Sequence, residues 1–211
     1  MVRDVNGRCT ALALAVLAVG AKTAAAAATE VVVLPITFHV AQIDGEPVVP
    51  PAFITERLMT ANQIFAPYGV AFAQAATLPL DAQHSELESR GDRDALGAEV
   101  GRGVIDCFVV RSLRDVDEPP RLRRGVHWHS HTHPGAHFVI LSSIAGPDVL
   151  AHELGHFLGN PAHSQTPGNL MSYQRGDQPP FLDPDQVARL ERALHGYLRR
   201  GELHALSSKP N

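Results

Sequence analysis

One short segment, His152-Glu153-Leu154-Gly155-His156, constrains this chain more than any other, because it carries the pattern H-E-x-x-H. Residues four positions apart lie on the same face of an α-helix, so His152 and His156 can bind one metal ion if the segment is helical. Glu153 then lies beside the ion and can accept a proton from a metal-bound water. The segment therefore predicts a metal-binding helix.

Gly159 predicts where this helix ends. Glycine adopts a positive φ without steric cost, as the residue that follows a helix often must. The turn would lead the chain back toward the metal and bring His163 within reach as a third ligand. Three protein ligands leave one coordination position open, which is typical of a catalytic zinc site.

The segment 152–173 resembles the metzincin zinc peptidases. Its second half, H-S-Q-T-P-G-N-L-M at residues 163–171, is similar to the matrixin pattern H-S-x-x-P-G-x-L-M. The resemblance implies a zinc ion, a general base and a Met-turn beneath the metal. By this resemblance, the zinc ligands would be His152, His156 and His163. Glu153 would be the general base, and Met171 would form the Met-turn.

The spacing departs from the metzincin pattern by one residue. In H-E-x-x-H-x-x-G-x-x-H the third histidine would stand at position 162, where this chain has Ala162. Either the loop 160–162 bulges by one residue and delivers His163, or the third ligand is weak or absent. Because the segment from Ser164 to Met171 keeps its matrixin spacing, we expect the bulge.

Tyr173 is the second candidate catalytic residue. It follows Met171 by two positions, which is similar to the Met-turns of astacins and serralysins. That resemblance implies a tyrosine that can approach the zinc and stabilise the oxyanion of the reaction. The alternative is a half-buried aromatic side chain that only packs.

The apolar pattern predicts an α/β (α+β) fold. Segments 31–40, 68–73, 105–110 and 138–143 are predicted strands, and Pro35 should place the first strand at an edge or interrupt it. Helices are predicted at 53–65, from Pro147, and from Pro184 with Asp183 as N-cap, followed by a frayed tail from Gly201. The resemblance implies a metzincin-like zincin, in which a twisted mixed sheet packs on the active-site helix and a small C-terminal subdomain ends in a helix.

A second histidine-rich segment lies between Val126 and His137. If this segment is extended, its alternating histidines share one face. They could then hold an accessory zinc or copper ion, or form a wall of the substrate groove, whereas a solvated polar loop is the third possibility. The candidate accessory ligands are His127, His129, His131 and His133.

Residues 1–28 have the pattern of a signal peptide. Arg3 and Arg8 precede an apolar stretch that is too short to span a bilayer, and an alanine-rich stretch offers cleavage sites. We therefore expect residues 29–211 to form a single monomeric domain that is secreted or periplasmic, without a membrane anchor. The net charge of −4 argues against nucleic-acid binding.

These features predict a zinc-dependent endopeptidase whose peptide or protein substrate lies extended along an edge strand near His127. Acidic residues between 81 and 103 could bind calcium, although they form no recognisable calcium loop. Two alternatives remain. The shifted His163 would suit a non-catalytic zinc-binding protein, although such a protein has no need of Glu153 as a base. The histidine content would suit an exported metal-sequestering protein.

Overall fold

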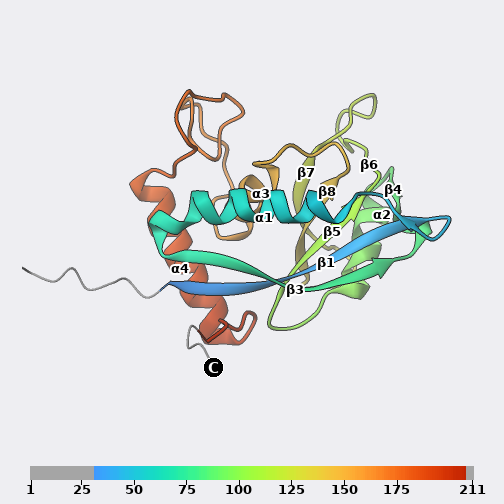
Figure 1. The fold of residues 1–211 in the computed structure, drawn as a ribbon, viewed down its shortest axis with the longest axis horizontal. Helices are drawn as coiled ribbons and strands as arrows, with labels where there is room; N and C mark the ends of the chain where they lie inside the picture. The colour runs from blue at the N-terminus through green and yellow to red at the C-terminus, as the bar shows by residue number, and fades with distance from the viewer. Residues whose placement is uncertain (1–30, 208–211) are drawn as a thin grey trace, which may run out of the picture.

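The computed structural model describes residues 31–207 (Figure 1), so the predicted signal peptide lies outside the described residues. Within this range the chain builds a mixed sheet with helices on both faces. The elements, in chain order, are β1 (Val32–Ile43), β2 (Glu46–Pro47), α1 (Pro51–Phe65), β3 (Val70–Leu80), β4 (Glu86–Leu87), α2 (Arg90–Ala95), β5 (Ile105–Val110), β6 (Ser112–Leu113), β7 (Gly125–His129), β8 (His137–Ser142), α3 (Val149–Phe157) and α4 (Pro184–Arg200).

The main sheet has six strands. Strands β3, β1, β5 and β8 run parallel in that spatial order, and β7 pairs antiparallel with β8 at the edge of the sheet. The short β2 pairs with the end of β1, while β4 and β6 form a separate parallel pair. This arrangement confirms the predicted α/β class with a mixed sheet.

Apolar side chains cover both faces of the sheet. In β5, Cys107 and Val109 belong to the core that also contains buried residues of α1, α3 and α4. Phe108 and Val110 belong to a second core on the opposite face, beside α2. Every residue of β5 is buried, as expected for a central strand of an α/β sheet. Figure 1 shows α1 lying across the sheet and α4 crossing the end where the chain enters β1.

Pro35 does not place β1 at an edge, because β1 is flanked by β3 and β5. However, β1 pairs with β5 only from Ile36 onward, so Pro35 lies in a part of the strand that has a neighbour on one side. A residue without a backbone N–H is tolerated there. The register with β3 shifts directly after it, between Ile36 and Thr37.

Two predicted helix boundaries have different outcomes. Helix α4 begins as expected: Asp183 accepts a hydrogen bond from the Gln186 amide and Gln186 reciprocates, which forms a capping box. Helix α3 begins at Val149 rather than at Pro147, and Asp148 makes no capping bond with its side chain. The Asp148 carboxylate instead forms a 3.0 Å ion pair with Arg175 of a distant loop.

The sequence predicted a frayed tail from Gly201, but the chain is held in place up to Leu206. Leu203 is buried, the His204 amide donates to the Gly103 carbonyl at 2.9 Å, and the Leu206 amide donates to the Val33 carbonyl at 2.8 Å. These contacts are long-range, so a local pattern could not have predicted them. Among the helices of residues 31–207, none combines the length and apolar character that crossing a bilayer requires.

Candidate metal centre and cleft

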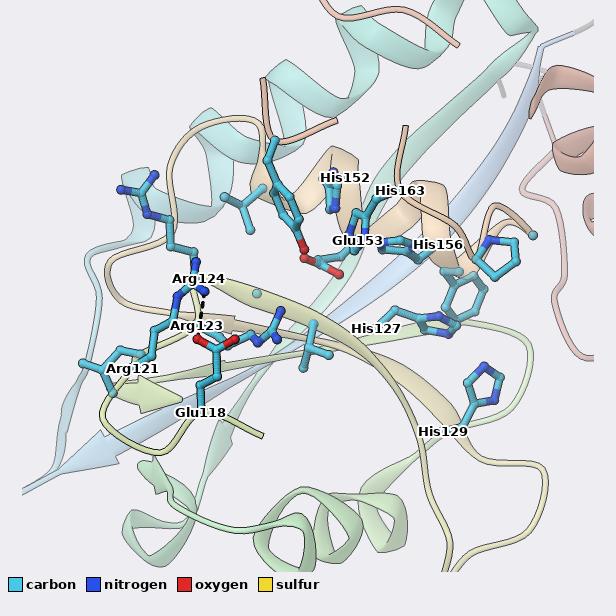
Figure 2. Close-up of a pocket in the computed structure, with 18 of the residues that line it drawn as sticks. Glu118, Arg121, Arg123, Arg124, His127, His129, His152, Glu153, His156 and His163 are labelled. Atoms are coloured by element: carbon cyan, nitrogen blue, oxygen red, sulfur yellow. Dashed lines mark hydrogen bonds and ion pairs between the residues drawn. The ribbon is translucent and has the colours of Figure 1, made fainter. Parts of the chain in front are cut away.

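Three histidines converge at the end of α3 (Figure 2). Helix α3 places His152 and His156 one turn apart, and the chain then reverses at Gly159, whose φ is +93°. The following loop returns His163, so that the ligand atoms of the three imidazoles all lie within 4.8 Å of one another. The Nε2 atoms of His156 and His163 are 3.2 Å apart. The loop thus brings His163 to the cluster, whereas Ala162 is exposed.

Backbone carbonyls orient two of these rings. His152 Nδ1 lies 2.8 Å from the Leu170 carbonyl oxygen, and His156 Nδ1 lies 2.7 Å from that of Asn160. Because a carbonyl can only accept, each Nδ1 carries the hydrogen and each Nε2 presents a lone pair. Burial, followed by the neighbouring His152, lowers the pKa of His156 to about 4. The donor set is therefore neutral and suits a divalent metal ion such as zinc.

Glu153 lies beside this cluster and is almost completely buried, with 6% of its surface exposed. Burial raises the pKa of its carboxyl group to about 8, although a hydrogen bond from the backbone of His127 and the charge of Arg123 act in the opposite direction. In the absence of a cation the group is therefore protonated at neutral pH. A nearby metal ion would favour the carboxylate, which is the form that can accept a proton.

Met171 is fully buried against α3. A Cβ added to Gly155 would lie only 2.5 Å from the Met171 sulfur, so the absence of a side chain at Gly155 lets the methionine approach the helix between the two metal-facing turns. The Met171 amide donates to Asn169 Oδ1 at 2.9 Å. Asn169 in turn exchanges two hydrogen bonds with Gln186, of 2.7 and 3.0 Å. Gln186, which closes the capping box of α4, thus also anchors this turn, a contact that has no local sequence signal.

Tyr173 lines the same cleft and remains 66% exposed, so it is not the half-buried packing residue of the alternative prediction. Its ring centroid lies 4.4 Å from that of His163. Burial lowers the pKa of Arg123, but the charge and hydrogen bond of Asp115, followed by the smaller interaction with Tyr173, outweigh burial and raise that pKa overall. Arg123 forms a 2.9 Å ion pair with the buried carboxylate of Asp115. An arginine in a charged loop carries no local signal for such a contact.

The cleft that contains these groups has a volume of about 1200 Å³. Strand β7 forms one side of it, and α3 with the loop around His163 forms the other. Figure 2 shows Glu118 and three arginines at one end and His127 and His129 at the other. The arginines are Arg121, Arg123 and Arg124. Within residues 31–207, β7 pairs with β8 alone, so its outer edge, where the His127 backbone hydrogen-bonds with Glu153, faces the cleft.

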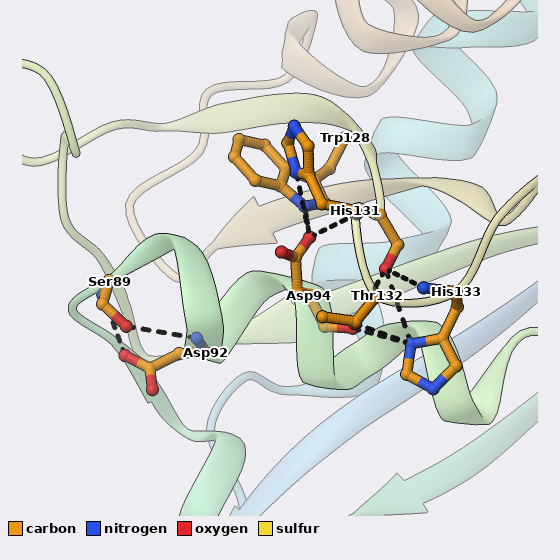
Figure 3. Close-up of polar contacts among 8 residues, drawn as sticks. Ser89, Asp92, Asp94, Trp128, His131, Thr132 and His133 are labelled. Carbon is orange, nitrogen blue, oxygen red and sulfur yellow. Dashed lines mark hydrogen bonds and ion pairs between the residues drawn. The ribbon is translucent and has the colours of Figure 1, made fainter.

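The second histidine-rich segment is not one extended strand but a hairpin, so the four predicted accessory ligands do not gather together. His127 and His129 lie on β7, next to His137 at the start of β8. His131 and His133 lie in the turn, where both contact Asp94 (Figure 3). Burial, followed by neighbouring histidines, lowers the pKa of His127 to about 2 and that of His137 to about 4.

The acidic segment 81–103 forms no calcium-binding cluster in the described structure. Asp92 closes a capping box with Ser89, and Asp94 accepts hydrogen bonds from Trp128 and from the His131 amide. Within residues 31–207, the groups of three or more candidate ligands consist of histidines alone. Calcium, which prefers oxygen ligands, has no such cluster there.

The mixed sheet, the histidine-bearing helix and the buried turn beneath it form a fold that solved structures of metalloproteinases share. The chain is similar to metalloproteinase-II from Bacteroides fragilis, with a TM-score of 0.53 and 15% identity over 77% of this chain, and it spans only 53% of that protein. It is also similar to mirolysin bound to compound 9, with a TM-score of 0.56 and 13% identity, and to mature mirolysin from Tannerella forsythia with a cleaved peptide, with a TM-score of 0.55 and 12% identity.

Both mirolysin alignments cover 83% of this chain and 100% of the other. No protein-family model matches the sequence, and no curated protein matches it significantly. At these identities the likeness shows a common fold.

Proposed function

We propose that this chain is a zinc-dependent endopeptidase with His152, His156 and His163 as metal ligands. The observation that carries the proposal is the convergence of the three imidazoles beside a buried carboxyl group, with two Nε2 atoms 3.2 Å apart. Two nitrogen ligands of a tetrahedral zinc, each bonded at about 2.0–2.1 Å, lie about 3.3 Å apart. The site therefore fits zinc without a large rearrangement.

Bound zinc would polarise the scissile carbonyl and lower the pKa of a water molecule in the cleft. Glu153 is the general base: its carboxylate accepts the proton of that water and later delivers the proton to the leaving amine. In the metal-free protein burial raises the pKa of this carboxyl group to about 8, so its carboxylate is a stronger base than that of an exposed glutamate. Tyr173, oriented by Arg123, donates its hydroxyl hydrogen to the developing oxyanion.

A peptide substrate fits the cleft as an additional strand. The outer edge of β7 faces the cleft beside the three histidines, and an extended peptide can pair with the backbone of such an edge. One solved structure of similar fold, mirolysin, holds a cleaved peptide. Backbone pairing tolerates many side chains, so the proposal names peptides and proteins as the substrate class and excludes nucleic acid.

The cellular context is part of the same proposal. Residues 1–28 act as a signal peptide, and residues 29–211 form one monomeric catalytic domain that is secreted or periplasmic. The signal-peptide pattern of basic residues, a short apolar stretch and small residues at the cleavage region supports export.

The variant Glu153→Gln tests the proposal, because glutamine keeps the shape of the side chain but cannot act as the base. Zinc content and hydrolysis of casein and of quenched fluorescent peptides are measured on the purified protein. We expect zinc binding to persist and hydrolysis to fall at least about 100-fold, the lower limit for loss of a general base. Glu191→Gln, at an exposed position of α4, is the matched control and should retain full activity.

Three results would contradict parts of this proposal. A wild-type protein that binds zinc but cleaves none of these substrates would be the non-catalytic zinc-binding protein considered above. Full activity of Glu153→Gln would remove Glu153 from the mechanism. A zinc stoichiometry that is unchanged by the combined loss of His152 and His156 would place all of the metal elsewhere and favour the metal-sequestering alternative.

A further inference from the structure

The β7–β8 hairpin assembles a second histidine cluster, built from His127, His129 and His137. His127 and His129 are two residues apart on β7 and therefore project from the same face, whereas Trp128 between them is buried on the other side. The register pairs His129 directly with His137 and pairs His127 with Val139. Antiparallel pairing thus brings together three imidazoles from two strands.

The distances within this cluster suit a metal ion. The candidate ligand atoms of the three side chains lie within 4.8 Å of one another. His127 Nε2 and His137 Nδ1 are 3.0 Å apart, close to the separation of about 3.3 Å expected for two nitrogens on a tetrahedral zinc. The rings of His129 and His137 stack with centroids 5.2 Å apart, so His129 can reach the same ion by a rotation of its exposed side chain.

The surroundings hold the cluster in place on its inner side. The His137 ring stacks on Phe157 of α3 with centroids 4.3 Å apart and on Tyr197 of α4 at 5.3 Å. His127 also packs against Phe157, at 5.4 Å. These aromatic rings restrict two of the three imidazoles, while His129 remains exposed to the solvent. The cluster therefore has an ordered inner part and an open path for a metal ion.

We propose that His127, His129 and His137 bind a second divalent transition-metal ion, of which zinc is the probe, at the rim of the cleft. Imidazole ligands are suited to zinc, copper and nickel rather than to calcium or magnesium. The ion joins β7 to β8 at the end of the hairpin and fixes the edge strand relative to α3. This site is distinct from the His152, His156 and His163 cluster and does not depend on the proposed peptidase activity.

A pair of hydrogen-bonded neutral imidazoles is the competing account of the same geometry. His127 and His137 are within hydrogen-bond distance without any metal, and His129 would then be a solvent-exposed neighbour. The two accounts differ in what happens when His129 is removed. Under the metal account His129 is a ligand, whereas under the hydrogen-bond account its loss changes nothing about metal binding.

Zinc stoichiometry after equilibrium dialysis, measured by elemental analysis on the folded protein, tests the proposal. We expect two zinc ions per chain in the wild type and one in His129→Ala, an exposed substitution that should leave the fold intact. A His156→Ala/His163→Ala variant should also retain one, and its combination with His129→Ala should retain none. His131→Ala and His133→Ala are matched controls from the same hairpin and should retain two.

A second readout is thermal stability in a zinc titration of the His156→Ala/His163→Ala background, where zinc can act only at the hairpin. A ligand that binds only the folded state raises the unfolding midpoint temperature. In this background the midpoint should therefore rise as zinc is added, and the addition of His129→Ala should abolish the rise. A hairpin that binds no zinc in this background, or binding that is unchanged by His129→Ala, would overturn the proposal. Failure of peptide hydrolysis would bear only on the proposed function.

Discussion

The Nε2 atoms of His156 and His163 lie 3.2 Å apart, although seven positions separate the two residues and Ala162 stands where the metzincin spacing would place the third histidine. The longer loop is accommodated between Gly159, at φ +93°, and Ser164, whose amide donates to the Met171 carbonyl at 2.9 Å. The extra residue is absorbed at Pro161 and Ala162, which are exposed. The loop thus carries one more residue without displacing the imidazole from the cluster.

His163→Ala should weaken zinc binding at this centre and abolish hydrolysis. Loss of one of three protein ligands should cost more than the roughly 10- to 100-fold typical of losing a partner of a ligand. Zinc affinity and peptide hydrolysis are the measurements, and His195→Ala, an exposed histidine on α4, is the control. If zinc affinity and activity both survived in His163→Ala, the bulged loop would not supply the third ligand.

Zinc binding at neutral pH should release a proton from Glu153. The pKa of this carboxyl group is raised to about 8 in the metal-free protein, so the group is mostly protonated at pH 7, and a cation nearby favours its ionised form. Titration calorimetry in buffers of different ionisation enthalpy measures the number of protons released. The wild type should release close to one proton more than Glu153→Gln at pH 7.

The same difference should shrink as the pH rises through the pKa of Glu153, because the carboxyl group is then already ionised before zinc binds. The comparison with Glu153→Gln removes protons that come from other groups. An equal release from both proteins at pH 7 would show that Glu153 is ionised without the metal, contrary to the effect of its burial.

Gly155→Ala should destabilise the fold and disturb the metal centre. The new Cβ would lie 2.5 Å from the Met171 sulfur, and such overpacking typically costs about 1–3 kcal/mol, against a gain of at most about 1 kcal/mol in helix propensity. Urea denaturation measures the free energy of unfolding. Gly91→Ala in α2, whose nearest contact would be 3.6 Å, is the control and should be neutral or stabilising.

Gln186→Ala should lower both stability and zinc affinity. Gln186 is 3% exposed and exchanges hydrogen bonds with Asn169, which holds the Met171 amide. Its loss leaves the buried Asn169 amide unpaired, at a cost of about 1–3 kcal/mol. Asp185→Asn, an exposed change in the same helical turn, is the comparison. A variant as stable as Asp185→Asn would mean that a water or another group replaces Gln186.

Tyr173→Phe should lower kcat with little change in KM, because the hydroxyl acts on charge that develops only in the transition state. Removal of one such donor typically costs about 100- to 1000-fold in kcat. The ring, which lies 4.4 Å from His163, would remain in place. Steady-state kinetics on a quenched peptide provides the test, and an unchanged kcat would assign Tyr173 to the cleft wall alone.

The sequence by itself determined the elements whose signals are local. The spacing of His152 and His156 on one helical face, the turn at Gly159 and the capping box of Asp183 with Gln186 depend on residues within a few positions of one another. The buried strand β5 follows from a continuous apolar run, which only a central strand can bury on both sides. These predictions agree with the structure because short-range sterics and periodicity decide them.

Tertiary structure alone decided the relationships between distant segments. Hydrogen bonding between Asn169 and Gln186 and the contact of Arg123 with Asp115 and Tyr173 join residues with no common periodicity. The same holds for the division of the histidine-rich segment, which the sequence left open between an extended strand and a polar loop: the turn places His131 and His133 at Asp94, and pairing with β8 brings His137 to His127 and His129. Side chains far apart in sequence meet only when loops close and strands choose a register, and the energy of that choice comes from burial of the whole core rather than from the residues that meet.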